Sequence, residues 1–278
     1  TTTAEIRKAN LAITGLTATN KIYDGNTTAT LTGTAAVAAL QGDTVSLSGS
    51  AAATFDSKNV GTGKAITTGY TLTGTDAGNY NLITPSLTAD ITPKALTISG
   101  ITAANKVYDS TTAASLIAGT ASNPGSYTLS GFITGQGAYI NQTSATYNSA
   151  DVASASTVLT TLNSANYVAT AGTNLSNYSL PLSIIGSGSI TPATLTMTAN
   201  AAAKFVGQAD PTNFTYTLSG LKGADTSSVL TNVSVTRQAG EIATVDRTSP
   251  NTNVPYVITP SATAANYNVV PVTAGFTI

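Results

Sequence analysis

An internal threefold repeat constrains the fold more than any other feature of this sequence. Residues 11–25 contain Leu-Ala-Ile-Thr-Gly-Leu followed by Lys-Ile-Tyr-Asp-Gly, and residues 96–110 repeat this pattern with the same spacing from leucine to lysine. A weaker copy begins at Leu195, with Lys204 nine residues later. An Asn-Tyr pair also recurs near the far end of each copy. Because a repeat determines the architecture of the whole chain, the repeat boundaries are established first.

These shared motifs predict an N-terminal linker followed by three repeats, each large enough to have its own hydrophobic core. The linker is residues 1–8, the first repeat 9–93, the second repeat 94–192 and the third repeat 193–278. The second repeat carries an insertion, in which residues 163–167 partly duplicate the Asn-Tyr element at Asn177 and Tyr178. Pro93 and Pro192 leave short joints, so we expect neighbouring repeats to follow end to end with restricted bending.

Hydrophobic residues within each repeat alternate with Thr, Ser or Ala, as Leu195 and Met197 do. This period of two is typical of half-buried strands. Threonine, 53 of 278 residues, suits the solvent face of a strand because it is β-branched and carries a hydroxyl. No long helix is indicated, although short helical pieces are compatible with residues 34–40 and 225–230. We therefore expect an all-β chain of three small modules, each β-grasp-like or an immunoglobulin-like sandwich.

The composition excludes several classes of function. The chain has no Cys and no His, so thiolate chemistry, disulfides, zinc fingers and imidazole bases are absent. Charged residues make up 8% and the net charge is −1, which is unlike a nucleic-acid-binding surface. The carboxylates are single residues in turns rather than catalytic pairs or calcium loops. We expect no enzyme activity, no catalytic residues, no metal and no cofactor.

The recurrent lysine and Tyr-Asp pair are the candidate ligand-binding or structural residues. The tyrosine could stack on a sugar ring, or it could pack into the core while the aspartate caps a turn. We favour the structural interpretation, because Val206 replaces the tyrosine in the third repeat. A Lys–Asn isopeptide crosslink at Lys21, Lys106 or Lys204 is a further idea that no pattern selects. The candidates are Lys21, Tyr23 and Asp24 in the first repeat and Lys106, Tyr108 and Asp109 in the second.

Together with Gly-Asp-Thr-Val at 42–45 and Asp-Ala-Gly-Asn-Tyr at 76–80, residues 21–25 resemble the YDG repeat of large bacterial surface exoproteins. The third repeat resembles the related MBG repeat through residues 204–221. Both repeats occur in filamentous-haemagglutinin-like adhesins exported by two-partner secretion. The resemblance implies β-rich stalk or adhesin modules, favours the β-grasp order and carries no catalytic residues. One departure is Ser110, which replaces the glycine of the Tyr-Asp-Gly triplet.

We therefore expect tandem stalk and interaction modules of a secreted bacterial surface adhesin, acting in cell adhesion or biofilm. A cysteine-free, charge-poor chain suits export, and no segment has the pattern of a signal peptide or membrane span. The alternative is a set of carbohydrate-binding modules that recognise exopolysaccharide or host glycans. The expected partners are polysaccharides, glycans or other copies of the adhesin, without nucleic acid or membrane insertion. Exposed tyrosines would favour the carbohydrate alternative, and buried tyrosines would favour the stalk.

Overall fold

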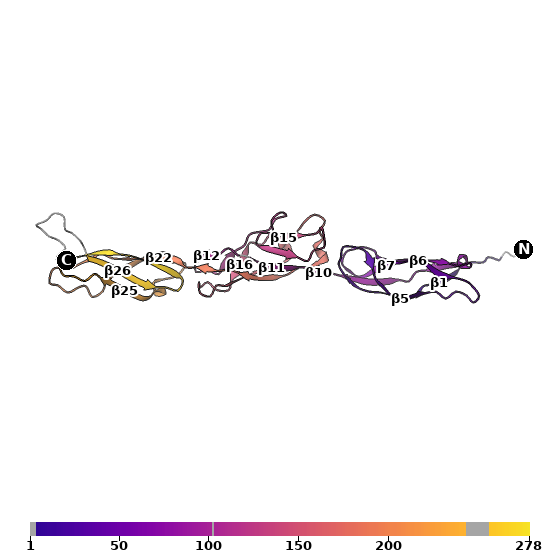
Figure 1. Ribbon diagram of the computed structural model, residues 1–278, viewed down its shortest axis with the longest axis horizontal. Coiled ribbons are helices and arrows are strands. Elements are labelled where there is room, and N and C mark those ends of the chain that lie inside the picture. The colour runs from indigo at the N-terminus through magenta and orange to yellow at the C-terminus, as the bar shows by residue number, and fades with distance from the viewer. Residues whose placement is uncertain (1–3, 102, 243–255) are drawn as a thin grey trace. The chain divides into compact units, whose positions relative to one another are not determined.

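The computed structural model describes residues 4–101, 103–242 and 256–278, and these residues form an all-β structure (Figure 1). They contain strands and short 3₁₀ helices but no α-helix, which confirms the predicted fold class. The Ala-rich residues 34–40 form the end of strand β5 (Leu31–Ala36) and the loop that follows it. The short helical piece predicted there was wrong, because β5 pairs with a neighbouring strand. Residues 225–230 do contain a 3₁₀ helix, Ser227–Val229. No described helix is long and apolar enough to cross a membrane.

The chain divides into two compact units, which are described separately. Unit 1 comprises Thr1–Ser99, Leu129–Tyr139 and Tyr167–Pro181, and unit 2 comprises Gly100–Thr128, Ile140–Asn166 and Leu182–Ile278. The second repeat therefore contributes to both units. The three repeat boundaries stay a prediction from the sequence. Of the predicted linker, residues 4–8 form no strand or helix, and residues 1–3 lie outside the described residues.

In unit 1 the first repeat is built from one larger sheet and two strand pairs. Strand β1 (Ala9–Ala12) pairs in parallel with β8 (Tyr80–Ile83), and β2 (Thr14–Ala18) pairs with β5. The larger sheet has the order β3-β9-β7-β6-β4. Its strands are β3 (Lys21–Ile22), β9 (Leu87–Thr92), β7 (Gly61–Thr73), β6 (Ser46–Phe55) and β4 (Thr28–Ala29).

The hydrophobic core of unit 1 extends from the first repeat into the second. Strand β10 (Lys94–Ala95) follows β9 after Pro93 and pairs in parallel with β19 (Tyr178–Ser179). Leu96 and Tyr178 of the second repeat share one buried cluster with Tyr23 of the first. The two repeats are therefore joined by common core packing and not by the proline link alone. Other strands of the second repeat are β11 (Thr97–Ile101), β14 (Tyr127–Ser130), β15 (Ala138–Ile140) and β18 (Tyr167–Ala169).

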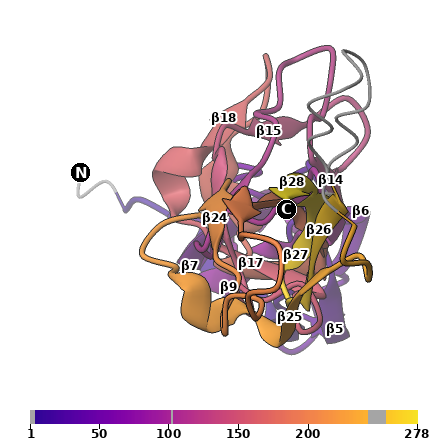
Figure 2. The same cartoon turned by 90° about the vertical axis from the view of Figure 1, so that its left-hand side faces the viewer.

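In unit 2 the second repeat contributes an antiparallel sheet of order β13-β16-β17-β20 and a parallel pair, β12 with β21. The third repeat contains a sheet of order β24-β22-β27 and a sheet of order β23-β28-β26-β25, whose strand β26 lies between β25 and β28 (Figure 2). The strands of the second repeat are β12 (Lys106–Val107), β13 (Ala113–Ser115), β16 (Ser144–Tyr147), β17 (Thr157–Thr161), β20 (Ser183–Ser187) and β21 (Ile190–Thr191). Those of the third are β22 (Ala193–Ala199), β23 (Ala202–Ala203), β24 (Tyr216–Ser219), β25 (Thr231–Arg237), β26 (Tyr256–Thr263), β27 (Tyr267–Val272) and β28 (Ala274–Thr277).

The third repeat shows most clearly how alternation builds the core. Strand β22 buries every second residue, including Leu195 and Met197, as the period of two predicts. Ala199 of this strand shares a buried cluster with Ile258 and Phe276 of the other sheet. Two sheets facing one apolar layer form a sandwich, which is the second of the two predicted alternatives.

Candidate functional site

The Tyr-Asp turn of the first repeat is fixed by the lysine that precedes it. Strand β3 places Lys21 so that its Nζ lies 2.8 Å from Asp24 Oδ1 and donates to the carbonyl oxygens of Asn26 and Thr28 at 2.9 and 3.0 Å. Asp24 Oδ1 also accepts the backbone N–H of Asn26 at 3.1 Å, which makes an Asx turn. Desolvation opposes ionisation of Asp24, but these hydrogen bonds outweigh it and lower the pKa of the carboxyl.

The second repeat reproduces this turn with one change of residue type. Lys106 Nζ lies 2.7 Å from Asp109 Oδ1 and donates to the Thr111 carbonyl at 2.7 Å. The Thr111 N–H donates to Asp109 Oδ1 at 2.9 Å, and the pKa of Asp109 is lowered in the same way, against a desolvation effect. The lysine and the aspartate of each candidate set therefore form an ion pair within the turn.

Each of these lysines also lies over an aromatic ring of its own repeat. Lys21 Nζ is 5.5 Å from the centre of the Phe55 ring, and Lys106 Nζ is 5.5 Å from the centre of the Tyr147 ring. A cation over an aromatic face is attracted by the ring quadrupole, which adds to the hold on the turn. The departure at Ser110 does not change the turn, because Ser110 adopts a φ of 65° where Gly25 has 82°.

The tyrosines of both turns are buried against the next repeat. Tyr23 is 1% exposed and meets the ring of Tyr178 edge-on, with centroids 5.4 Å apart. Tyr108 is 6% exposed and meets Tyr267 in the same manner at 5.2 Å. The first contact lies within unit 1 and the second within unit 2. Sequence reasoning placed each tyrosine in the core of its own repeat. The buried cluster that contains Tyr23 does include Phe55 and Ile91 of the first repeat, and it continues to Tyr178 of the second, so this tyrosine also lies at the joint between the two repeats.

At the first joint, one loop of the second repeat receives both tyrosine hydroxyls. The Tyr178 hydroxyl accepts the backbone N–H of Ile133 at 3.3 Å and donates to Gln136 Oε1 at 2.6 Å. The same glutamine donates from Nε2 to the Tyr23 hydroxyl at 3.0 Å. Burial raises the pKa of Tyr178. A single glutamine side chain therefore links the two repeats through polar contacts beneath the ring pair.

At the second joint, an aspartate takes the place of this glutamine. The Tyr267 hydroxyl accepts the backbone N–H of Lys222 at 2.8 Å and donates to Asp225 Oδ2. The Tyr108 hydroxyl donates to the same oxygen at 3.0 Å. Burial, with the hydrogen bond to Asp225, raises the pKa of Tyr267 to about 12, and the pKa of Tyr108 is raised for the same two reasons.

The asparagine of the Asn-Tyr element forms a second set of contacts between the repeats at the first joint, here called the asparagine grip. Asn177 is 1% exposed, and its Oδ1 accepts the backbone N–H of Val60 at 2.9 Å. Its Nδ2 donates to Asn59 Oδ1 at 3.0 Å. Both partners lie in the hairpin loop between β6 and β7 of the first repeat, so a buried amide bridges the two repeats.

The second joint has the same grip on a corresponding loop. Asn266 Oδ1 accepts the backbone N–H of Val152 at 2.9 Å, and its Nδ2 donates to Asp151 Oδ1 at 2.8 Å. Sequence reasoning missed both loops. The signal was present as an Asn-Val or Asp-Val pair between two strands of each of the first two repeats, at residues 59–60 and 151–152.

The third repeat keeps its lysine in register but lacks the tyrosine. Ile66 pairs with Leu87 and Ile258 with Ala274, so Ile91 and Ile278, four residues further on, are equivalent. Lys21 lies opposite Ile91, and the parallel pairing of Ala203 with Thr277 places the next residue, Lys204, beside Ile278. The register therefore agrees with the predicted match of Lys204 to the other lysines, and Val206 stands where the first repeat has its tyrosine.

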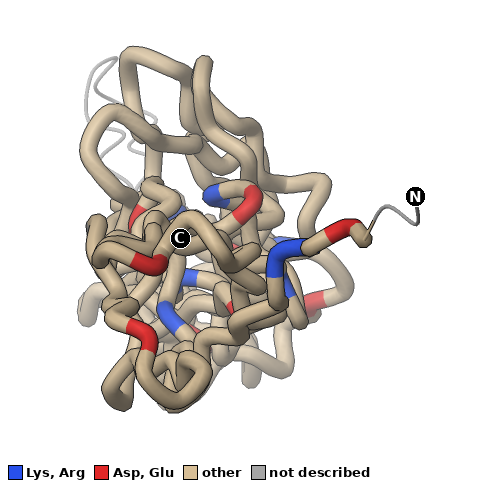
Figure 3. Tube along the Cα trace, turned by 90° about the vertical axis from the view of Figure 1, so that its right-hand side faces the viewer, with Lys and Arg blue, Asp and Glu red and all other residues tan. Residues whose placement is uncertain are grey.

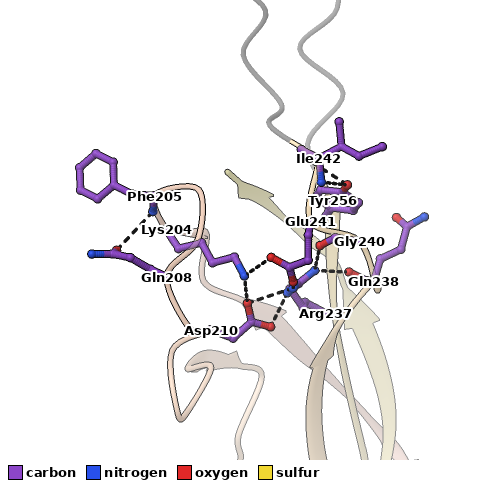
Figure 4. A network of polar contacts seen from close by, with 10 residues as sticks. All are labelled: Lys204, Phe205, Gln208, Asp210, Arg237, Gln238, Gly240, Glu241, Ile242 and Tyr256. Carbon is purple, nitrogen blue, oxygen red and sulfur yellow. Dashed lines mark hydrogen bonds and ion pairs between the residues drawn. The ribbon is translucent and has the colours of Figure 1, made fainter.

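Lys204 belongs to a network of charges at this end of the third repeat (Figure 4). Its Nζ lies 2.8 Å from Asp210 Oδ1 and also contacts Glu241, and Arg237 bridges the same two carboxylates. The Arg237 guanidinium, with help from Lys204, lowers the pKa of Asp210 to about 2. Arg237 also lies 5.0 Å over the ring of Phe276. This end of the repeat therefore covers its core with ion pairs.

The contacts of the three lysines are those of ion pairs. The pKa of Lys204 is raised by its hydrogen bonds to Asp210 and Glu241, whereas amide formation needs a neutral amine. Lys21 Nζ lies 3.0 Å from Asn26 Oδ1, but Thr111 takes the place of this asparagine beside Lys106. The isopeptide idea therefore has no common geometry across the repeats.

Charged residues are few and scattered along the described chain (Figure 3). Within residues 4–101, 103–242 and 256–278, no three His, Cys, Asp or Glu side chains are grouped to hold a metal ion. The recurring contacts of the described residues are those at the joints, and these define the candidate functional site.

Comparison with protein families agrees with these recurring turns. A model of the YDG domain matches residues 6–89 and 92–185, which is more than half of the chain. The chain belongs to the YDG domain family. Beyond the two YDG domains, a model of the MBG domain (YGX type) matches residues 195–277. The different match of the third repeat accords with Val206 at its tyrosine position.

The other two comparisons add little to the YDG assignment. No curated protein matches the chain. Among solved structures, the crystal structure of the N-terminal four Ig domains of Dscam1 isoform 4.44 covers 95% of this chain and 74% of its own, with 10% identity and a TM-score of 0.24. A similarity at this level carries no argument about fold or function.

Proposed function

We propose that this YDG chain is a non-enzymatic spacer whose repeats are locked to one another at side-chain joints. In this proposal it forms part of the stalk of a secreted bacterial surface adhesin that acts in cell adhesion or biofilm. The observation that carries the proposal is the repetition of one joint, in which a tyrosine of one repeat is buried against the Asn-Tyr element of the next. A mechanical role needs fixed joints, and two joints with the same contacts meet that need.

The contacts of the joint explain why it resists bending. The edge-on ring pair excludes water and fixes the separation of the two repeats, and such pairs add about 0.5–1.5 kcal/mol beyond area burial. The asparagine grip lies on a different loop, so a rotation that preserves the ring contact breaks its hydrogen bonds. Two separate contacts on neighbouring loops restrict both rotation and separation.

The burial of Tyr23 and Tyr108 disfavours the carbohydrate alternative at these residues. A ring that stacks on a sugar must present one face to solvent, whereas both rings are covered by the following repeat. Asp24 and Asp109 are likewise engaged with lysine and backbone groups. The spacer proposal therefore expects no glycan binding that depends on the Tyr-Asp turn.

Small-angle X-ray scattering of the whole chain tests the proposed spacer. The proposal expects the maximum dimension of an extended row, unchanged by Asn79→Ala, and a broader distance distribution for Asn177→Ala. A glycan and exopolysaccharide array with the same proteins and a Tyr23→Phe variant tests the alternative. A compact or fully flexible wild-type chain, or saturable glycan binding that Tyr23→Phe abolishes, would overturn the spacer proposal.

A further inference from the structure

The first repeat has its own copy of the loop that receives tyrosine hydroxyls at the two joints. Tyr80 is buried, and its hydroxyl accepts the backbone N–H of Leu40 at 2.9 Å and donates to Asp43 Oδ2 at 2.6 Å. Leu40 and Asp43 have the same three-residue spacing as Lys222 and Asp225 at the second joint. Asp225 accepts hydrogen bonds from two tyrosine hydroxyls, whereas Asp43 accepts one, from Tyr80.

This third copy faces solvent, unlike the other two. Leu40 is 65% exposed, whereas Ile133, which holds the equivalent position at the first joint, lies under the turn at Gly25. Asn79 is exposed, and its side chain has no hydrogen-bond partner among the described residues. The equivalent Asn177 is buried and holds two partners of the preceding repeat.

An isoleucine before the first repeat provides a second, independent observation. Strand register places Ala9 and Lys94 at the same position, because each lies opposite the tyrosine of its Asn-Tyr element. Ile91 lies three residues before Lys94 and is buried in the last strand of the preceding repeat. Ile6 lies three residues before Ala9 and is 100% exposed. Ile6 therefore has the register of the buried isoleucine that precedes the joint between the first two repeats.

We infer that Ile6, Leu40, Asp43, Asn79 and Tyr80 form a docking surface for a further YDG-type repeat that continues into Ile6. The tyrosine of its Lys-x-Tyr-Asp turn packs against the ring of Tyr80, and the hydroxyl of that tyrosine donates a second hydrogen bond to Asp43. It also presents an Asn-Val or Asp-Val loop to the side chain of Asn79. Both interactions follow from the two occupied joints.

A second copy of this chain is a poorer occupant than another YDG-type repeat. Its third repeat offers Val206 in place of the tyrosine, so it supplies neither the ring nor the hydroxyl. Its Tyr23 and Tyr108 are already buried in joints of their own. The occupant must therefore carry a free Tyr-Asp turn, which the described ends of this chain do not supply. The inference rests on the proposed spacer function only in that both use the same joint contacts.

The test extends the whole chain by one repeat. Residues 9–90 are joined directly to Ile6, so that Ile6 takes the place of Ile91 in the added repeat. In the extended chain, Asn79→Ala in the original first repeat is expected to lower the midpoint of urea unfolding, as Asn177→Ala does. In the original chain the same substitution leaves the midpoint unchanged. An added copy that carries Tyr23→Ala serves as the matched control and abolishes the difference.

A second extension guards against a poorly folded added repeat. Residues 94–189, which carry the Tyr-Asp turn of the second repeat and its Asp-Val loop, are joined to Ile6 in the same way. If Asn79→Ala in the original first repeat is neutral in both extended chains while Asn177→Ala lowers the midpoint, the docking surface is overturned and the joints stand. If Asn177→Ala is neutral as well, the joint account behind both proposals fails.

Discussion

The Tyr-Asp ends of the first two repeats differ from the equivalent end of the third. In the first two, a tyrosine is buried against the following repeat, and in the third, Val206 stands at its position and is 66% exposed. The lysine differs as well, because Lys21 pairs with one carboxylate of its turn, whereas Lys204 shares two carboxylates with Arg237. The first kind of end is apolar and docked, and the second is charged.

This difference shows that a short, hydroxyl-rich repeat can obtain its fixed joints from very few residues. Tyrosine suits the joint because its ring is buried while its hydroxyl still reaches a polar partner. The third repeat lacks this tyrosine, and the buried charge of Lys204 is balanced there by two carboxylates that also contact Arg237. The predictions below set the docked ends against the charged end, from the largest expected effect to the smallest.

Removing the joint tyrosine should have the largest effect. Tyr23→Ala or Tyr108→Ala deletes a buried ring and should lower the free energy of unfolding by about 3 kcal/mol, as other large-to-small core substitutions do. Ile22→Ala is the matched control because Ile22 is adjacent and exposed, and it should change stability by less than about 0.5 kcal/mol. Urea unfolding measures both values, and equal effects would contradict the joint.

Removing the asparagine grip should cost less. Asn177→Ala leaves the backbone N–H of Val60 without its acceptor and should cost about 1–3 kcal/mol. Asn79→Ala removes the same side chain at the exposed copy and should be neutral in the same urea titration. A neutral Asn177→Ala would show that the contact does not stabilise the joint.

Alkaline pH should loosen the second joint before it affects the charged end. The pKa of Tyr267 in the folded protein is about 12, above its usual value of 10, so the neutral hydroxyl is favoured by folding. The stability it contributes is present below pH 10 and is lost as the pH rises through 12. Ultraviolet titration of tyrosinate should show a late phase that Tyr267→Phe removes, and ionisation of all tyrosines near pH 10 would contradict the buried hydroxyl.

Acid should act at the charged end of the third repeat. The folded-state pKa of Asp210 is about 2, below its usual value of 3.8, so its contribution is complete above pH 3.8 and is lost as the pH falls through 2. Hydrogen exchange of the β25 amides should accelerate over this window. The acceleration should be smaller in high salt than in low salt, because salt screens the ion pairs. In Asp210→Asn the acceleration between these pH values should be smaller, and an identical profile would contradict the network.

The smallest effect should come from the turn itself. Ser110 holds a left-handed φ of 65° that glycine adopts more easily, so Ser110→Gly should stabilise unit 2 by about 0.5–1 kcal/mol. Gly25→Ser, the reciprocal change, should destabilise unit 1, because a Cβ at Gly25 meets Ile133. Thermal unfolding of both variants measures the pair, and effects of the same sign would contradict the equivalence of the turns.

The sequence predicts the all-β class and much of the core, because alternation such as Leu195 with Met197 reports which face is buried. It also predicts that Tyr23 is structural and that Asp24 caps a turn. The joint itself could not be predicted, because Tyr23 meets Tyr178 across a whole repeat and no local pattern specifies such a contact. The alignment of Lys204 with Lys21 could be predicted, but its ion pairs could not, because Asp210 and Glu241 come from other segments of the chain.

The most direct test of the joints is native-state hydrogen exchange at the backbone amides of Val60 and Val152. Both lie in loops between strands and donate to an asparagine of the following repeat. The account predicts that both amides are protected, that Asn177→Ala removes the protection of Val60 alone, and that Asn266→Ala removes that of Val152 alone. Exchange of both amides at the rate of exposed loop residues in the wild-type chain would contradict it.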